Sequence, residues 1–388
     1  MITVLADDFS GAAEIAGIAW RYGLQTIVQT EIDLSVNHDI IVIDTDTRSK
    51  KENETSKIHR SLAHILKLSK IDWFYKKTDS VLRGHIIAEL ESLAAEFGMN
   101  KILVAANNPS AGRVIRNNIY YINNHKLHET DFRFDPEFPL KSSLVTEILG
   151  PSDQFPVTYL DRKKTITGTG IFVPEILNAE DLSQRASEVR ENVLPAGGSD
   201  FFRSLLEVKG YSLRTIPELQ EKHSNQNRFF VLASTSELSR EFRLNCQKNG
   251  VPVCNLPCTT LNTSELNEDC LQRWVNHIKA SFNKSRYVVA TVMHPLNKES
   301  GFAKALNQFI SQIVKEVLER IELDELIVEG GGTTSHLVRF LGWKNFIPVR
   351  EYSTGVVELH SEEYSGCTLT VKPGSYPWPE YFIPVNIR

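Results

Sequence analysis

The strongest constraint on the fold is an alternation of short apolar runs with amphipathic segments along the first half of the chain. The apolar runs have the length and composition of strands, and they lie at 2–5, 25–30, 39–43, 71–75 and 101–106. Two of the segments between them, 58–66 and 86–97, carry apolar residues at helical spacing. Such an alternation predicts an α/β fold, in which helices flank a mostly parallel sheet.

Polar side chains follow four of these predicted strands at the point where each strand ends. The clusters are Asp7 with Asp8, Asp44 with Asp46 and Arg48, Lys77 with Asp79 and Arg83, and Asn107 with Asn108 and Arg113. Because parallel strands place their carboxyl ends at one edge of the sheet, we expect these clusters to lie together, where open α/β sheets bind ligands. One cluster alone would suit a solvated turn with a local ion pair, whereas four predict a ligand pocket.

The turn Lys77–Gly84 lies between the run 71–75 and the helical pattern 86–97. It brings two cations and a carboxylate into one short segment, together with the hydroxyl of Ser80. This combination suits a small ligand that is both anionic and hydroxylated.

Further elements are predicted downstream, followed by a domain boundary. We expect a hairpin around Asn123-Asn124, an extended loop at 130–139, strands at 157–160 and 169–173, a helix at 180–193, and a turn into another helix at 195–200. The polar stretch 220–228 is typical of a linker. Since 388 residues exceed the ~100–200 of one domain, we expect two domains, 1–222 and 223–388.

The second half repeats the alternation. Strands are predicted at 229–233, 251–255, 286–292 and 326–328, and helices at 236–249, 266–282 and 302–321. The last of these strands runs into Gly330-Gly331-Gly332, ahead of a predicted helix at 335–341. Glycines allow a ligand to approach the backbone, and a helix amino end offers N–H groups to a phosphate. A tight turn without a ligand would use the same glycines, and neither a Walker motif nor a dinucleotide fingerprint is present.

Composition narrows the function classes. A net charge of −5 without a Lys/Arg run gives no footprint for nucleic acid, and no apolar stretch reaches the ~18 residues of a membrane span. Asp7-Asp8 come too early for a signal peptide, and five cysteines, an odd number, favour reduced thiols in the cytoplasm. Cys254, Cys258 and Cys270 cluster, but the Cys254/Cys258 spacing lacks the second pair that a zinc site would need.

Short motifs along the chain resemble, in order, those of the four-carbon acid sugar kinase family. Ala6–Ala12, Asp44–Ser49, Lys77–Gly84 and Pro109–Arg113 are similar to its sugar-acid-binding signatures, and Ala233–Ser236, Gly331–Ser335 and Lys372–Ser375 to its nucleotide-binding motifs. The resemblance implies a sugar-acid-binding domain at 1–222, a nucleotide-binding domain at 223–388 and a ligand cleft between them. The implied reaction is ATP-dependent phosphorylation of a four-carbon sugar acid such as threonate, erythronate or a 3-oxo-tetronate.

The resemblance also implies roles for single residues. The substrate carboxylate is expected to meet Arg83, Arg113, Lys77 and Arg48, with arginine favoured because its planar fork matches a carboxylate. Asp46, Ser80 and Gly84 would complete the substrate site. Asp8 and Asp79 are the catalytic candidates, which would accept hydrogen bonds from hydroxyls while one of them takes a proton. Nucleotide contacts are expected at Ser234, Ser236, Gly331, Gly332, Thr333, Thr334 and Gly374.

Cofactors and partners follow from the same resemblance. ATP implies Mg2+, for which the sequence identifies no ligand. The expected partners are ATP and a small sugar acid, with no nucleic acid and no membrane, and the chain could form a homo-oligomer. Structural alternatives stay open: Asp8 could only cap a helix, Asp46 and Arg48 could pair only with each other, and Lys77 could be a solvated flank.

Two other classes of function compete with a kinase. A non-catalytic sugar-acid or nucleotide binder is suggested by Ala233, Thr333 and Ser375, which stand where the family's motifs have a glycine, an acidic residue and an asparagine-type turn. A different enzyme acting on sugar acids, such as an aldolase or dehydratase, is disfavoured because no convincing Schiff-base lysine or metal-ligand cluster is visible.

Overall fold

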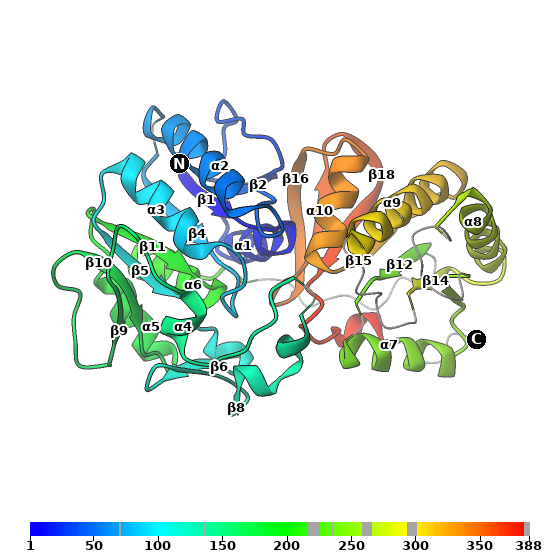
Figure 1. Cartoon of the computed structure of the whole chain (residues 1–388). Coiled ribbons are helices and arrows are strands. Elements are labelled where there is room, and N and C mark those ends of the chain that lie inside the picture. The colour runs from blue at the N-terminus through cyan, green and yellow to red at the C-terminus, as the bar shows by residue number, and fades with distance from the viewer. Residues whose placement is uncertain are drawn as a thin grey trace. The chain divides into compact units, whose positions relative to one another are not determined.

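Parallel strands form the centre of each of two units in the computed structural model (Figure 1). The first unit comprises Met1–Thr26 and Glu31–Arg214, and the second comprises Ile27–Thr30 and Thr215–Arg388. The structure describes residues 1–69, 71–135, 137–215, 226–234, 236–257, 266–292 and 301–383. The predicted linker falls largely outside these ranges, so the domain boundary at 222/223 stays a prediction.

The sheet of the first unit is parallel, with strand order β3-β1-β4-β11-β5-β10-β9. Its strands are β1 (Ile2–Ala6), β3 (Ile40–Asp44), β4 (Trp73–Lys77), β5 (Lys101–Ala105), β9 (Val157–Leu160), β10 (Gly170–Pro174) and β11 (Val193–Gly197). At the centre, Ala6 pairs with Asp44 on one side and Lys77 on the other. The residues that follow these three strands therefore leave the sheet side by side.

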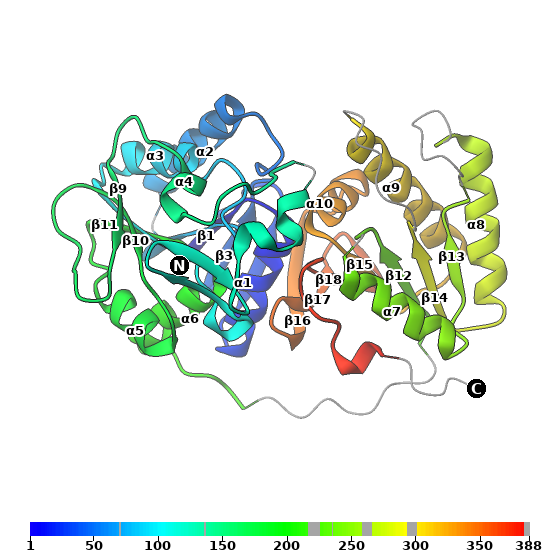
Figure 2. The same cartoon turned by 60° about the horizontal axis from the view of Figure 1, so that its bottom comes forward.

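Helices cover both faces of this sheet (Figures 1 and 2). One face carries α2 (Glu52–Lys67) and α3 (Ile86–Phe97), which pack together, and the other carries α1 (Phe9–Arg21), α5 (Ala179–Ser187) and α6 (Ser199–Val208). Helix α1 is almost entirely buried, because small residues such as Ala12, Ala13 and Ala16 let it lie close to the strands. The prediction of an α/β fold with a mostly parallel sheet is confirmed.

Strand β11 corrects the sequence prediction. The helix expected at 180–193 ends at Ser187 as α5, and the expected turn at 195–200 instead begins with a strand between β4 and β5. Pro195 argues against a central strand because it lacks an N–H group. The strand forms nonetheless, and β11 lies so close to β5 that a Cβ on Gly197 (φ 150°) would collide with the carbonyl oxygen of Ala105.

A small antiparallel sheet, β6-β7-β8, lies between β5 and β9 in the chain. It consists of β6 (Arg113–Arg116), β7 (Ile119–Ile122) and β8 (His125–Lys126). Asn123 and Asn124 turn between β7 and β8 with φ of 48° and 68°, as a two-residue hairpin turn requires, so the predicted hairpin is confirmed. Short helices complete the region: η1 (Pro109–Ala111), η2 (Leu127–Glu129), η3 (Asp131–Phe134) and α4 (Val145–Leu149). The loop expected at 130–139 thus starts as a 3-10 helix.

The second unit has a mixed sheet, with strand order β13-β14-β12-β15-β18-β17-β16-β2. Its strands are β12 (Arg228–Leu232), β13 (Val253–Asn255), β14 (Tyr287–Thr291), β15 (Glu325–Glu329), β16 (Asn345–Ser353), β17 (Val356–Ser361), β18 (Tyr364–Lys372) and β2 (Thr26–Gln29). Pairing is parallel from β13 to β18 and antiparallel from β18 to β2. The carboxyl ends of β12, β15 and β18 therefore share one edge.

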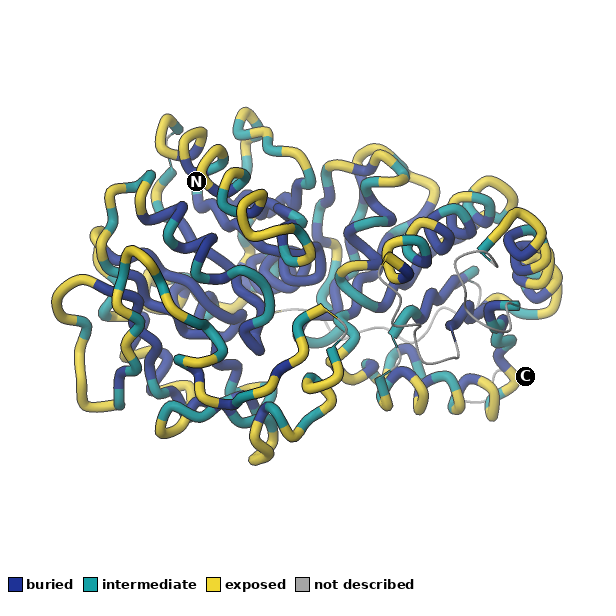
Figure 3. Tube along the Cα trace, viewed as in Figure 1, coloured by how far each residue is buried: buried dark blue, intermediate teal, exposed yellow. Residues whose placement is uncertain are grey.

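Helices also lie on both faces of this second sheet (Figures 1 and 2). One face carries α8 (Glu268–Phe282), α9 (Phe302–Arg320) and α10 (Gly331–Phe340), and the other carries α7 (Glu237–Lys248). After β18 the chain passes through η5 (Glu380–Phe382), and Trp378 stacks on Phe242 of α7 with ring centroids 3.9 Å apart. Figure 3 shows the parallel strands at the centre of both units as mostly buried and the outer faces of the helices as exposed. Within the described ranges, no helix combines the length and apolarity needed to cross a bilayer.

Candidate functional site

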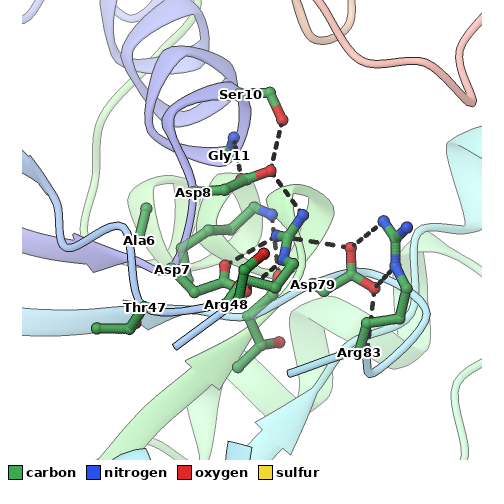
Figure 4. A network of polar contacts seen from close by, with 12 residues as sticks. Ala6, Asp7, Asp8, Ser10, Gly11, Thr47, Arg48, Asp79 and Arg83 are labelled. Atoms are coloured by element: carbon green, nitrogen blue, oxygen red, sulfur yellow. Dashed lines mark hydrogen bonds and ion pairs between the residues drawn. The ribbon is translucent and has the colours of Figure 1, made fainter. Parts of the chain in front are cut away.

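Arg48 connects the ends of three strands in the first unit (Figure 4). Its Nε and Nη2 donate to the two carboxylate oxygens of Asp7 at 2.7 and 3.0 Å, and its Nη1 donates to Asp8 Oδ2 at 2.6 Å. Nη2 also lies 3.6 Å from Asp79 Oδ1. Arg48 follows β3, the two adjacent aspartates follow β1, and Asp79 follows β4. The structure therefore brings three of the four predicted clusters together at one sheet edge.

Asp8 has two structural tasks. It caps α1, because its Oδ1 accepts the N–H of Gly11 at 2.7 Å, while its Oδ2 accepts the hydroxyl of Ser10 at 2.8 Å and the Arg48 guanidinium. A Cβ on Gly11 would lie 2.8 Å from Asp8 Oδ1, so glycine leaves room for this cap. The capping expected of Asp8 is present, and the ion pair with Arg48 adds to it.

Asp79 is held by hydrogen bonds from several sides. Arg83 donates from Nε and Nη2 at 3.0 and 2.8 Å, and the backbone N–H groups of Val81 and Arg83 donate to Asp79 Oδ2 at 3.2 and 3.1 Å. Burial alone would raise the pKa of Asp79, but the guanidiniums of Arg83 and Arg48 outweigh burial and hold this pKa well below its ordinary value. The Asp79 side chain therefore stays ionised and is a weak base.

The fourth cluster joins the third through Ser80. The Arg113 guanidinium donates from Nη1 to the Ser80 hydroxyl, and the hydroxyl of Tyr120 donates to the Ser80 carbonyl. Arg113 is the first residue of β6, and it is buried at 5% exposure. The polar groups after β1, β3, β4 and β5 thus form connected networks.

Strand β11 adds a fifth cluster that the sequence prediction did not assign to the site. Asp200 accepts the N–H and hydroxyl of Ser110 at 2.9 and 2.8 Å, and Asn108 Nδ2 donates to the Ser199 hydroxyl at 3.0 Å. These contacts tie the turn after β5 to the turn after β11. The sequence signal was the run Gly197-Gly198-Ser199-Asp200, which resembles the ends of the other strands. Asp7 was predicted only as a member of the first cluster, and Asp135 was given no role, although Asp135 accepts Arg83 Nη1 at 2.8 Å.

Other predicted substrate residues lie differently from the expectation. Lys77 is 3% exposed, and its Nζ lies 3.3 Å from Glu14 on α1 and donates to the Thr78 carbonyl, so it is not a solvated flank. Asp46 approaches Lys50 at 3.5 Å, and Arg48 contacts Asp7 and Asp8, so the alternative that Asp46 and Arg48 pair only with each other is wrong. Gly84 has a φ of 93° and lies against Arg48 and Asp7.

The chemistry of this edge follows from its charges. Asp7, Asp8 and Asp79 carry lone pairs that accept hydrogen bonds from hydroxyls, and the guanidiniums of Arg48 and Arg83 compensate their charge. Two open surface pockets of this unit are lined by residues such as His64 and Glu147, and they lie away from this sheet edge. The predicted pocket therefore stays a prediction.

In the second unit, the turns after β12 and β18 touch. The Ser236 hydroxyl donates to the Gly374 carbonyl at 3.2 Å and accepts the N–H of Ser239 at 3.3 Å, which caps α7. Ser234 Oγ accepts the Ser236 N–H at 3.2 Å. A Cβ on Gly374 would lie 3.2 Å from that same oxygen, a tight contact that glycine avoids.

The turn after β15 corrects the predicted helix start. Helix α10 begins at Gly331, not at 335, so Gly331 and Gly332 form its first turn, and only Gly330, with a φ of 107°, bends the chain. The Thr333 hydroxyl donates to Asn307 at 2.9 Å and the Thr334 hydroxyl to the Gly330 carbonyl at 2.8 Å. Helix geometry leaves the first N–H groups without intrahelical partners, and a Cβ on Gly332 would meet no described atom within 4 Å.

A metal cage is not part of the described structure. In the ranges given above, no group of three or more His, Cys, Asp or Glu side chains is placed to hold a metal ion. Cys254 is a buried free thiol that contacts the Ser281 hydroxyl at 3.3 Å. Cys258, the second cysteine of the predicted cluster, lies outside the described residues.

Comparison with known protein families also divides the chain into two parts. A family model described as a sugar-binding N-terminal domain matches residues 2–199, and one described as a nucleotide-binding C-terminal domain matches residues 229–376. The Arg48 network lies in the first match, and the turns after β12, β15 and β18 lie in the second or at its edge.

Individual relatives match this chain at low sequence identity. The chain is 30% identical over 157 residues to a D-threonate kinase of Salmonella typhimurium, a match that covers 40% of this chain and only 37% of that protein. It is 22% identical over 418 residues to a 3-oxo-tetronate kinase of the same organism, covering 98% and 97%. The solved structure of Haemophilus influenzae protein HI1011 has a TM-score of 0.68 at 19% identity and covers 98% of both chains, which shows a shared fold. Because the sugar-binding model alone spans 2–199 of 388 residues, just over half, this chain belongs to the four-carbon acid sugar kinase family.

Proposed function

We propose that this chain is an ATP-dependent kinase that phosphorylates a hydroxyl of a four-carbon sugar acid of the threonate, erythronate or 3-oxo-tetronate type. The observation that carries the proposal is the Arg48 network, which joins the ends of β1, β3 and β4 inside the part of the chain that matches a sugar-binding domain. The match of residues 229–376 to a nucleotide-binding domain supports ATP as the donor.

The proposed sugar-acid site uses both the carboxylates and the guanidiniums of that edge. The substrate hydroxyls donate to Asp8 and Asp79, and Arg83 and Arg113 hold the substrate carboxylate. Two guanidiniums keep the pKa of Asp79 low, so Asp79 orients the attacking hydroxyl and Asp8 takes its proton. Proton removal adds little to phosphoryl transfer, which depends mainly on positioning and charge neutralisation.

The remaining predicted residues take supporting roles in this proposal. Asp46, Ser80 and Gly84 shape the wall of the site, and Arg48 fixes the three carboxylates around it. Lys77 is assigned to positioning, since its ammonium already meets Glu14 beneath α1.

The proposed nucleotide site consists of the three adjoining turns of the second unit. The N–H groups of Gly331, Gly332 and Thr333 face the phosphates, as helix amino ends commonly do. The turns with Ser234, Ser236 and Gly374 hold the rest of the nucleotide, and Thr334 stabilises the first turn of α10.

Mg2+ and a cleft complete the proposal. Because the described side chains form no acidic cage, Mg2+ would arrive with ATP, on whose phosphates it is usually held with few protein ligands.

In-line phosphoryl transfer requires that ATP and the sugar acid meet, so the proposal includes a cleft between the sugar-acid-binding domain at 1–222 and the nucleotide-binding domain at 223–388. The use of ATP is consistent with a cytoplasmic enzyme.

The test is a coupled assay of ADP release. Purified protein is mixed with Mg-ATP and a panel of four-carbon sugar acids, with a panel of uncharged four-carbon polyols as the control. We expect ADP with at least one acid and none with the polyols. Tight binding of one acid without ADP would contradict the kinase and favour a non-catalytic binder.

A further inference from the structure

We infer that the buried ion pair Glu329–Lys372 positions the nucleotide site: it fixes the spacing of the three turns proposed to hold ATP and does not touch ATP itself. The inference rests on the proposed nucleotide site and assigns a role to two residues that the proposed reaction does not use. Glu329 is the last residue of β15 and Lys372 the last residue of β18. Both stand directly before the turns in question.

The pair lies completely inside the unit. Glu329 and Lys372 face each other in the register of β15 and β18, and both side chains are 0% exposed. Lys372 Nζ donates to Glu329 Oε1 at 2.7 Å and to the Pro373 carbonyl at 3.0 Å, while the Gly330 N–H donates to the Lys372 carbonyl at 2.9 Å. Lys372 is thus bonded both to the turn after β18, through Pro373, and to the turn after β15, through Gly330.

The second oxygen of Glu329 reaches the third turn. Ser239 Oγ on α7 donates to Glu329 Oε2 at 2.6 Å, and the Ser239 N–H donates to Ser236 Oγ at 3.3 Å. Ser236 Oγ in turn donates to the Gly374 carbonyl at 3.2 Å. The contacts form a closed ring from Glu329 through α7 to the turn after β18 and back through Lys372. One carboxylate therefore sets the distances among all three turns.

A gain in protein stability does not explain why this ion pair is so deeply buried. Removing two charges from water costs about as much as their attraction returns, and apolar residues of similar volume often replace such pairs without loss. Burial raises the pKa of Glu329 even though Lys372 lowers it, and burial likewise lowers the pKa of Lys372. What the pair supplies is fixed geometry, which a ligand site needs to within a fraction of an ångström.

Lys372 could otherwise be taken for a phosphate contact, because it precedes a glycine turn. Its ammonium is instead enclosed by Glu329 and the Pro373 carbonyl and lies 4.9 Å from the ring centroid of Trp378. A side chain with no exposed surface cannot meet a ligand without breaking the pair. Its role is therefore positional.

The same sheet contains a matched control pair. Arg228 and Glu325 form an ion pair at 2.9 Å with exposures of 1% and 3%. They lie on β12 and β15 at the amino ends of the strands, roughly 13 Å along β15 from Glu329 by strand geometry. This pair is equally buried but remote from the three turns.

The experiment compares two double variants of the full chain. Glu329→Gln with Lys372→Met removes both charges at the turns, and Glu325→Gln with Arg228→Met removes both at the opposite ends of the strands. MgATP affinity is measured by calorimetry, and the thermal midpoint is recorded for each variant. We expect the first variant to bind MgATP about tenfold more weakly or worse, with sugar-acid affinity unchanged. The control variant should keep wild-type MgATP affinity whatever its midpoint.

Ser239→Ala provides a second, milder variant that leaves the ion pair intact. It cuts the ring at α7, and we expect MgATP affinity to fall in the same direction but less. Wild-type affinity in both the Glu329/Lys372 variant and Ser239→Ala would overturn the inference, as would equal losses in the control pair. Failure of the wild-type chain itself to bind MgATP would refute the proposed nucleotide site first, which distinguishes the two failures.

Discussion

Replacing Arg48 by methionine should destabilise the first unit by about 3 kcal/mol near neutral pH, and by much less in acid. Arg48 carries the only charge that contacts Asp7 and Asp8 among the contacts described above, and it also approaches Asp79. Methionine keeps most of the volume and removes the charge. Asp7 and Asp8 would then lose the cation that contacts them, whereas Asp79 would keep its ion pair with Arg83.

The magnitude follows from burial. Breaking a buried ion pair by removing one partner costs about 3–5 kcal/mol. The Arg48 side chain is 16% exposed, against 3% and 7% for Asp7 and Asp8. Since water reaches part of the network, we place the loss at the lower end of that range.

The pH dependence has a defined sign. Burial raises the pKa of Asp7 and Asp79, but neighbouring cations, Arg48 among them, outweigh burial and bring both below the ordinary 3.8. Such groups add stability above their ordinary pKa and lose it as the pH falls through the folded-state pKa. Without Arg48 these pKa values rise, so protonation relieves the repulsion at a higher pH than in the wild type.

Urea unfolding followed by circular dichroism, at about pH 5 and about pH 8, measures this difference. The deficit of Arg48→Met against wild type should be larger at the higher pH. Arg60→Met on the exposed face of α2 is the control and should change stability by no more than ~0.5 kcal/mol. A deficit of the same size at both pH values would refute the electrostatic reasoning.

Three further predictions test other parts of the molecule. Asp79→Asn should lower kcat by about 100-fold through loss of orientation, while MgATP affinity in calorimetry is unchanged; unchanged kcat would remove Asp79 from the site. Gly197→Ala should destabilise the protein by about 1–3 kcal/mol, because its Cβ meets the Ala105 carbonyl; an unchanged unfolding midpoint would contradict that packing. Burial raises the pKa of the Cys246 and Cys367 thiols to about 12, so at neutral pH a thiol reagent should label both only after unfolding, and rapid labelling of the folded protein would contradict their burial.

Much of the fold could be predicted because strand and helix periodicities are local. The apolar spacing at 86–97 matches α3, and the asparagine pair of the hairpin has the positive φ values that its turn requires. Strand β11 was not predicted because Pro195 argues against a central strand, yet the structure pairs Pro195 with Leu103 of β5. The start of α10 was misplaced for a similar reason: glycine disfavours helix, yet Gly331 and Gly332 form the first turn.

The candidate site was partly predictable for a topological reason. Parallel strands bring their ends to one edge, so clusters far apart in the chain could be expected to meet, and Arg48 does contact residues 40 positions away. Which way each side chain points depends on register and packing. Lys77 ends a strand with its ammonium toward Glu14 rather than toward the cluster with Asp79, and sequence spacing holds no information on that choice.

The most direct test of phosphoryl transfer is the identity of the product. Purified chain, Mg-ATP and each four-carbon sugar acid are incubated together, and the acid is examined by mass spectrometry beside the ADP formed. The proposal predicts an acid that carries one added phosphoryl group in equal amount to ADP. ADP without a phosphorylated acid, or neither product with any acid, would contradict it.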